Sequence, residues 1–347
     1  MEHHLTQPSP SFHADGTRAT APAGAPGAST SGVAWRHPAA EATLGGGRTR
    51  RAEPGGVMTG ADGRRPIVVG VDPDPEKRLA LSWAADEAER RKLPLRLVHA
   101  QGTPTGGYRS GEVRPSWEEW NRELHGLGDQ VLKDAVSFVE SRQPAVDLST
   151  LLAEGEPAWI LHEESRDASL VVVGSRHLSR RRGLFSSASV ALPLAAHAAC
   201  PVVVVPEPEH ITQQPPYFVV GVDGSPHSAA AVDLAVEEAD RRGAIVRALY
   251  VWHPPLLGVL DEHATVNECR RVLAETVAGR TAAHPDVELH HEVVRGHPVE
   301  VLTEASEHAL GLVVGTRGHG GFTGMMLGSV SQGVLLHARC PVITVPV

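Results

Sequence analysis

The stretch Phe218-Val-Val-Gly-Val-Asp223 has a near-copy 151 residues earlier, Ile67-Val-Val-Gly-Val-Asp72. Each is a short run rich in β-branched residues that ends in a carboxylate. A second pair of segments matches at the same separation, because Ala84-Ala-Asp-Glu-Ala-Glu-Arg-Arg91 corresponds to Ala235-Val-Glu-Glu-Ala-Asp-Arg-Arg242. Ordered motifs that recur at a fixed separation are typical of a duplicated structural unit.

Further matches continue toward the C-terminus in the same order. Leu170-Val-Val-Val-Gly174 corresponds to Gly311-Leu-Val-Val-Gly315, and His197-Ala-Ala-Cys-Pro-Val202 corresponds to His337-Ala-Arg-Cys-Pro-Val342. We therefore interpret the chain as two tandem copies of one domain. The predicted domains span residues 65–206 and 216–347, and a linker spans 207–215.

Each copy alternates β-branched runs with amphipathic segments. In the second copy, this pattern predicts strands near 218–222, 245–252, 287–294, 312–315 and 342–345, and helices near 227–242, 260–283, 298–309 and 329–337. Strict alternation of strand and helix indicates right-handed crossovers and a parallel sheet with both faces covered. The predicted fold class is α/β, with two copies of an open, doubly wound, parallel five-stranded sheet flanked by helices.

Composition excludes several classes of protein. The 347 residues include 32 basic and 41 acidic side chains, for a net charge of −9, which argues against a nucleic-acid binder. The sequence has three cysteines, Cys200, Cys269 and Cys340, and no two of them form a Cys-x-x-Cys motif. We therefore expect neither a disulfide framework nor a thiolate metal site. The sequence offers no candidate membrane span or secretory signal, and we expect a cytoplasmic protein.

Residues 1–64 are rich in Ala, Gly, Pro, Ser, Thr and Arg and poor in large apolar side chains. Such a segment buries too little apolar surface to offset the entropy lost on ordering, so we predict that it is disordered. Met58 lies just before the first predicted strand, and it is an alternative start codon to Met1.

The chemistry of a doubly wound sheet is expected beyond the carboxyl ends of its strands. In the second copy, strand 1 leads into Asp223, and strand 4 leads into a loop that begins at Gly315 and ends at Gly328-Ser329. Glycines permit close approach of the backbone to a ligand, and a serine at a helix N-cap, together with the helix dipole, attracts phosphate. We expect Gly328 to let the chain turn into the helix and Ser329 to cap it.

The loop reads Gly315, two residues, Gly318, nine residues, Gly328, Ser329. In this spacing the sequence resembles ATP-binding members of the universal stress protein family, and the likeness extends over residues 65–347. The resemblance implies an adenine-nucleotide alpha-hydrolase-like fold and ATP as ligand, with Mg²⁺ as its counter-ion. The residues that it implies are Asp223 and Val251 for adenosine, Gly315 and Gly318 for sugar and phosphates, and Gly328, Ser329 and Val330 for the triphosphate.

The first copy departs from this pattern. Gly174 is kept, but His177 stands at the place of the second glycine and Ala188-Ser189 stands at the end of the loop. Asp72 is kept, but Pro73-Asp74-Pro75 follows it and adds a negative charge. We predict a weaker second site at Asp72, Gly174 and Ser189, which Arg180–Arg182 in the same loop could support by charge.

Each of these residues also has a simpler interpretation. Asp223 could close a turn, since Asp-Gly is a common turn pair, and Ser329 could serve only as a cap. Cys200 and Cys340 precede proline at the start of the last strand, where a small apolar side chain packs well, so we interpret them as core residues.

The functional hypothesis is a regulator of the stress response that binds ATP mainly through its C-terminal domain. The three lysines include none that follows a glycine, which excludes a Walker A loop, and no catalytic residue or metal ligand is predicted. The alternatives are a nucleotide-free scaffold of the same fold and a slow ATP hydrolase or adenylyl-transfer enzyme. The family resemblance implies that the two domains pair through Val202–Val205 and Val342–Val345; a homodimer and an unknown regulatory protein are further candidate partners.

Overall fold

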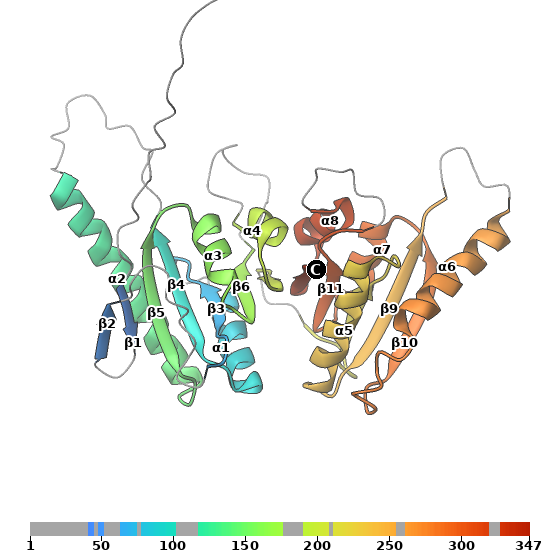
Figure 1. Cartoon of the computed structure of the whole chain (residues 1–347), viewed down its shortest axis with the longest axis horizontal. Coiled ribbons are helices and arrows are strands. Elements are labelled where there is room, and N and C mark those ends of the chain that lie inside the picture. Colours follow the sequence, from blue (N-terminus) through green and yellow to red (C-terminus); the bar gives the residue numbers. More distant parts are fainter. Residues whose placement is uncertain are drawn as a thin grey trace, which may run out of the picture. The chain divides into compact units, whose positions relative to one another are not determined.

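The computed structural model describes residues 41–44, 48–51, 63–74, 78–101, 117–175, 190–207, 211–254, 261–318 and 327–347. Within these ranges, side chains are described except at 41–51 and 117–124. The described chain contains two domains of the same topology, and one domain follows the other along the sequence (Figure 1).

Domain 1 alternates strands and helices as the sequence predicts. Its strands are β3 (Ile67–Gly70), β4 (Leu95–Gln101), β5 (Leu148–Glu154), β6 (Leu170–Gly174) and β7 (Val202–Val205). Its helices are α1 (Leu79–Arg91), α2 (Trp117–Arg142), α3 (Pro157–Ser165) and α4 (Ala191–His197). The strands are parallel and lie in the order β5-β4-β3-β6-β7.

Domain 2 repeats this arrangement. Its strands are β8 (Tyr217–Gly221), β9 (Ile245–Trp252), β10 (Leu289–Arg295), β11 (Gly311–Gly315) and β12 (Val342–Val345). Its helices are α5 (Pro226–Asp240), α6 (Glu262–Val277), α7 (Pro298–Ala305) and α8 (Ser329–His337). The parallel order β10-β9-β8-β11-β12 changes direction between β8 and β11, which confirms the predicted doubly wound fold.

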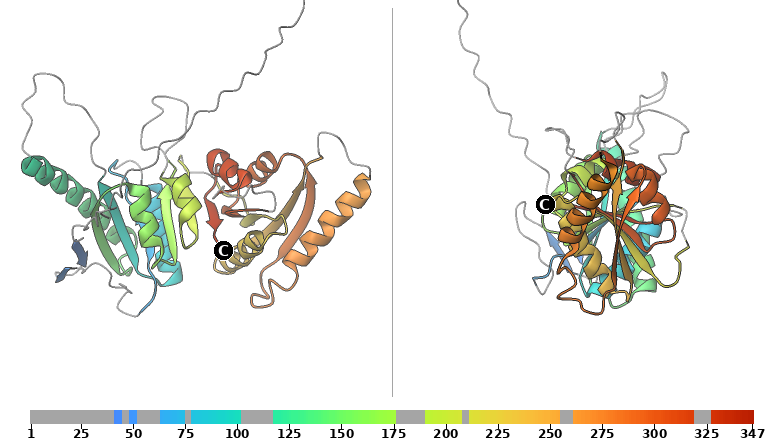
Figure 2. Two further views of the ribbon diagram at one scale, coloured as in Figure 1. Left: turned by 45° about the horizontal axis from the view of Figure 1, so that its top comes forward. Right: turned by 90° about the vertical axis from the view of Figure 1, so that its right-hand side faces the viewer.

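Alternate strand residues face opposite sides of the sheet, and each side carries its own helices (Figure 2). Val69 and Val203 belong to the core cluster that contains residues of α1, α2, α5 and α6. Val68 and Val202 belong to the cluster that contains residues of α3, α4, α7 and α8. Cys200 and Cys340, which each precede a proline, are both buried in the second cluster. Their predicted role as core residues is therefore confirmed.

The two domains are joined edge to edge by their last strands. β7 and β12 pair antiparallel, with Val342 opposite Val204 and Thr344 opposite Val202. The predicted pairing through these segments is therefore present. It merges the two parallel sheets into one sheet in which β10 and β2 (Arg48–Arg51) are the outermost strands.

Two short strands lie inside the segment predicted to be disordered. β1 (Glu41–Leu44) pairs antiparallel with β2 and with the edge strand β5. An edge strand presents unpaired backbone groups, so it can recruit a segment whose side chains would not predict a strand. The prediction for residues 1–64 therefore missed these two strands.

Two helices end earlier than their sequence pattern suggests. α6 ends at Val277 instead of near residue 283, because Ala278 leaves helical geometry and Gly279 takes a φ of 72°. α7 ends at Ala305 instead of near residue 309. The apolar periodicity continues past the ends of both helices, so periodicity alone did not locate them.

Candidate functional site

The predicted site residues of domain 2 gather at the carboxyl edge of its sheet. β8 lies between β9 and β11, and the three strands are parallel, so their carboxyl ends meet at one edge. Asp223 follows β8, and Gly315 is the last residue of β11. Their juxtaposition lies where the strand order changes direction, which is the expected place for a ligand in such a sheet.

Asp223 contacts two segments that are far apart in the sequence. Its Oδ1 accepts a hydrogen bond from the Ser225 backbone N–H at 2.9 Å, which closes a turn. Its Oδ2 faces Gly318, where an added Cβ would lie only 2.2 Å from that oxygen. The carboxylate therefore serves as a turn residue and also reaches the loop that follows β11.

Gly315 lies against the first turn of α5. A Cβ added to Gly315 would lie 2.6 Å from the Cβ of His227 and 2.9 Å from the carbonyl oxygen of that residue. The sequence predicts that Gly315 and Gly318 are glycines because a ligand approaches them. In this structure packing against the His227 backbone already requires glycine at 315, whereas a side chain at 318 would instead displace the Asp223 carboxylate.

This contact predicts a difference between equivalent glycines of the two domains. Gly315→Ala should lower the free energy of unfolding by about 1–3 kcal/mol, because the new methyl group meets the His227 backbone. Gly174→Ala at the corresponding place in domain 1 is the control, since its Cβ would make an ordinary 3.8 Å contact with Ala80. Urea unfolding followed by circular dichroism measures both changes. Equal stability of the two variants would contradict the packing role of Gly315.

α8 begins at Ser329 as predicted, but its N-cap lies one residue earlier than predicted. Gly328 is the N-cap, because its carbonyl accepts the hydrogen bond from the Gln332 N–H at 2.9 Å, and Ser329 is the first helical residue. The prediction that Ser329 is the N-cap was therefore wrong. Gly328 has a φ of −68°, which any residue adopts, and an added Cβ would be 3.5 Å from its nearest neighbour, so the turn itself does not require glycine.

Two hydrogen bonds hold the start of α8 against the end of β11. The buried Ser331 hydroxyl donates to the Gly315 carbonyl at 2.6 Å, and the Gly328 N–H donates to the Thr316 carbonyl at 2.8 Å. Ser331 was missed by sequence reasoning, although a second serine in the first turn of a helix was a signal for it. These bonds place the first-turn N–H groups, and thus the positive end of the helix dipole, beside the strand end.

Charged and ionisable groups surround this edge. Burial lowers the pKa of His227, and Arg317 lowers it further, while Asp223 opposes the shift; the resulting pKa is below the ordinary value. The lowered pKa favours the neutral imidazole. His227 was not singled out from the sequence, because a histidine in the first turn of a helix is by itself an unremarkable pattern. Arg317 is exposed, as a residue of the loop after β11.

The serine after Asp223 fixes the start of α5. Ser225 is the N-cap, and its hydroxyl oxygen accepts from the Ser228 N–H at 3.2 Å, while Pro226 occupies the first helical position. A serine followed by a proline is a common helix start, which the predicted boundary at residue 227 overlooked. This cap orients the first turn that carries His227.

The remaining predicted residues lie near the same edge. Val251 lies on β9, two residues beyond Leu249, whose carbonyl accepts from the Val222 N–H at 2.9 Å. Leu249 is the partner of Gly221 in the parallel pair of β9 and β8. Val251 and Asp223 each lie two residues beyond that pair, so they are level with each other. Val330 is the half-buried second residue of α8. The structure thus brings the seven predicted residues of domain 2 to one edge.

Domain 1 has a hollow of about 210 Å³ at the corresponding edge. Its lining includes Asp72 and Gly174, two of the three residues of the predicted second site. Asp72 repeats the turn of its counterpart, because its Oδ1 accepts from the Asp74 N–H at 2.9 Å. The third residue, Ser189, and the basic segment 180–182 lie outside the described residues.

The described ranges lack two further features. None of the helices there has the length and apolar character needed to cross a membrane. The same ranges contain no group of three His, Cys, Asp or Glu side chains placed to hold a metal ion.

Comparisons with known proteins agree with the repeat. The model of the universal stress protein family matches residues 63–206 and 218–346. A universal stress protein of Mycobacterium tuberculosis strain H37Rv is 36% identical over 285 residues, which cover 80% of this chain and 95% of that protein. A second one from the same strain is 35% identical over 286 residues, with the same coverage of both chains.

The fold is also found among solved structures. The crystal structure of a universal stress protein from Archaeoglobus fulgidus superposes with a TM-score of 0.62 at 17% identity, covering 82% of this chain and 97% of that one. At this identity the similarity concerns the fold alone.

Proposed function

The chain belongs to the universal stress protein family, and on this basis we propose that it binds ATP at the carboxyl edge of the sheet in domain 2. One observation carries the proposal. The Asp223 carboxylate, the glycine-spaced loop after β11 and the first turn of α8 converge where the strand order changes direction. This convergence combines an acceptor for hydroxyl groups with an electropositive helix start.

The residues present fit such a ligand. The Asp223 carboxylate would accept hydrogen bonds from the ribose hydroxyls, and Val251 would pack against the base. The N–H groups of Ser329 and Val330 would face the phosphates, for which the absent side chain of Gly328 leaves space. Mg²⁺ bound with ATP would neutralise part of the phosphate charge.

We assign the weaker site to domain 1. Asp74 supplies a carboxylate at the position that Ser225 occupies in domain 2, and a negative charge there opposes a triphosphate. The hollow beside Asp72 and Gly174 nevertheless offers space for a ligand. We therefore expect about one tightly bound ATP per chain, and isothermal titration calorimetry would measure this stoichiometry.

The proposed role is a nucleotide-dependent regulator of the stress response. ATP would be retained and would alter contacts with a protein partner or the assembly of the chain. We assign no nucleophile or general base to the site, and we expect no rapid turnover of ATP.

Analysis of the purified protein tests this role. The protein is denatured, and the released small molecules are identified by mass spectrometry; the native protein is also incubated with ATP. Released ATP that the native protein does not convert supports the proposal. Absence of nucleotide, together with failure to bind added ATP, would favour a scaffold, and rapid formation of ADP or AMP would favour an enzyme.

Ser329→Ala should weaken ATP binding. Loss of one hydroxyl donor to phosphate costs about 1–2 kcal/mol, or roughly 5- to 30-fold in Kd. Titration calorimetry of this variant is compared with that of Ser141→Ala, which removes an exposed hydroxyl at the end of α2. The same affinity in both variants would show that the Ser329 hydroxyl does not contact the ligand.

A further inference from the structure

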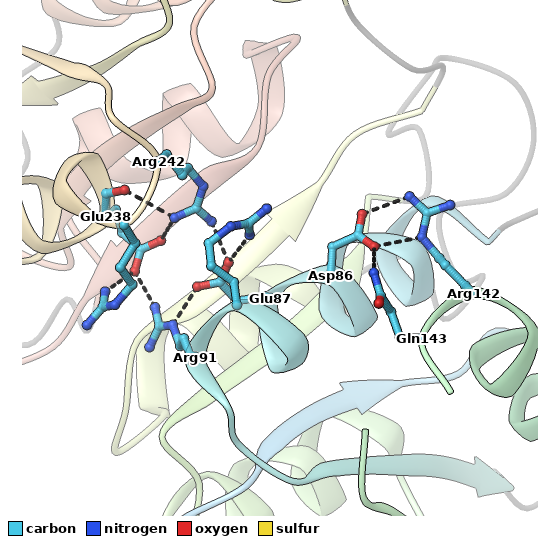
Figure 3. Close-up of polar contacts among 9 residues, drawn as sticks. Asp86, Glu87, Arg91, Arg142, Gln143, Glu238 and Arg242 are labelled. Carbon is cyan, nitrogen blue, oxygen red and sulfur yellow. Dashed lines mark hydrogen bonds and ion pairs between the residues drawn. The ribbon is translucent and has the colours of Figure 1, made fainter. Parts of the chain in front are cut away.

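Four charged side chains form an ion-pair cluster between α1 and α5, the first helices of the two domains (Figure 3). They are Glu87 and Arg91 of domain 1 and Glu238 and Arg242 of domain 2. Both glutamates are fully buried, and the side chains of Arg91 and Arg242 are only 12% and 11% exposed. We call this set the interdomain cluster.

The interdomain cluster pairs each domain with the other in the same way. Arg242 contacts Glu87 at 2.5 Å, and Arg91 contacts Glu238. Each arginine also pairs with the glutamate four residues before it in the sequence. Because the two helices carry the same charges four residues apart, each surface is complementary to a copy of itself.

The arginines keep the buried charges compatible with folding. Burial by itself raises the pKa of Glu87, but Arg242 and Arg91 outweigh it and hold the pKa below its ordinary value. Arg90 also contacts Glu87 at 2.7 Å, and Arg241 contacts Glu238 at 2.7 Å. The carboxylates thus remain ionised across the interface, where the loss of one partner would leave a buried charge uncompensated.

The pairing of β7 with β12 does little to determine which domain joins which. β7 contains four valines and β12 reads Val-Ile-Thr-Val, so a slipped register would still place β-branched residues opposite one another. Apolar edge strands of this kind also pair readily with other sheets. The interdomain cluster, by contrast, tolerates only a surface with the reciprocal charges at the matching places.

We propose that the interdomain cluster selects the domain with which each half of the chain pairs. The partner that it fits is a domain of the same fold with glutamate and arginine four residues apart at the end of its first helix. Within one chain, the other domain meets this requirement. A second copy meets it as well, so linkage within the chain favours the internal pair by raising its effective concentration.

Reversing the charges of one domain tests the selection. The variant with Glu87→Arg and Arg91→Glu, named S1, should repel its own domain 2, because arginine would face arginine and glutamate would face glutamate. The variant with Glu238→Arg and Arg242→Glu, named S2, should repel its own domain 1 for the same reason. The full chain that carries all four substitutions should regain both cross-domain pairs.

Association between chains gives the decisive measurement. A reversed domain is complementary to any reversed domain, and an unreversed domain to any unreversed one, so two copies of S1 satisfy each other although one copy does not satisfy itself. Tagged S1 should therefore retain untagged S1 or S2 at least tenfold more than it retains the untagged unaltered chain, whose own two domains already match. The control reverses the exposed pair Arg271 and Glu275 on α6, whose side chains are 55% and 62% exposed, and should not exchange partners.

Stability provides a second measurement in case S1 or S2 folds poorly. The fourfold variant should unfold at a higher urea concentration than S1 or S2, because it regains both cross-domain pairs. It should remain below the unaltered chain, because Arg90 and Arg241 would each face an introduced arginine. The proposal is overturned if folded S1 retains S1 and S2 no better than it retains the unaltered chain, or if the fourfold variant is no more stable than S1 and S2.

Discussion

Glu238→Ala should lower the free energy of unfolding by about 3–5 kcal/mol. The substitution leaves Arg91 and Arg242, both nearly buried, without the carboxylate that they share across the two domains. The expected loss is that of a broken buried pair, in which the remaining charges have little access to water. Urea unfolding monitored by circular dichroism measures it in the absence of nucleotide.

An exposed glutamate provides the matched control for this loss. Glu275 pairs with Arg271 on α6, and both side chains are more than half exposed. Exposed pairs typically contribute 0–1 kcal/mol, so Glu275→Ala should change stability by less than about 1 kcal/mol. If Glu238→Ala and Glu275→Ala cost the same, the buried pairs between the domains contribute no more than surface charges do.

Gly318→Val should abolish tight ATP binding while leaving the fold intact. Its Cβ would lie 2.2 Å from the Asp223 Oδ2 and 3.3 Å from the Cγ, so the carboxylate must move out of the site. Losing a charged hydrogen-bond acceptor and adding a branched side chain should weaken binding about 100-fold or more. Titration calorimetry with ATP measures the change, and circular dichroism checks the fold.

Gly126→Val is the control for this substitution. Gly126 lies on α2, and a Cβ there would have no neighbour within 4 Å. This variant should bind ATP as the unaltered chain does. ATP affinity that is equal in the Gly318→Val variant and the unaltered chain would remove the loop after β11 from the proposed site.

Much of the fold could be predicted because the chain is duplicated. The strands 245–252 and 342–345 and the helix 329–337 were located to the residue, since β-branched runs and flanking turn residues marked their ends. β1 and β2 escaped prediction because their formation depends on an unpaired edge of β5, which only the assembled sheet reveals. Tertiary pairing therefore decided what local composition did not.

The sequence predicted which residues form the site, but it did not give every physical reason why those residue types are needed there. Glycine spacing located Gly315 and Gly318, yet the tight contacts of these residues with His227 and Asp223 become visible only once α5 packs on β11. Ser329 was misplaced by one position, because sequence alone does not show which carbonyl accepts the first helical hydrogen bond. The charges between the domains were part of the repeat, but their burial required the two copies to meet.

The antiparallel pairing of β7 with β12 also limits how many chains could join by adding strands to the sheet. In a head-to-tail arrangement every added copy would expose a fresh edge and a filament could elongate, whereas here the two closing strands saturate each other. At the far end of domain 2, β10 carries His290, His291 and Glu292, all exposed, and polar side chains on an outer strand discourage further addition. The closing strands of the two domains thus occupy each other within one chain, and neither is left to join a third sheet.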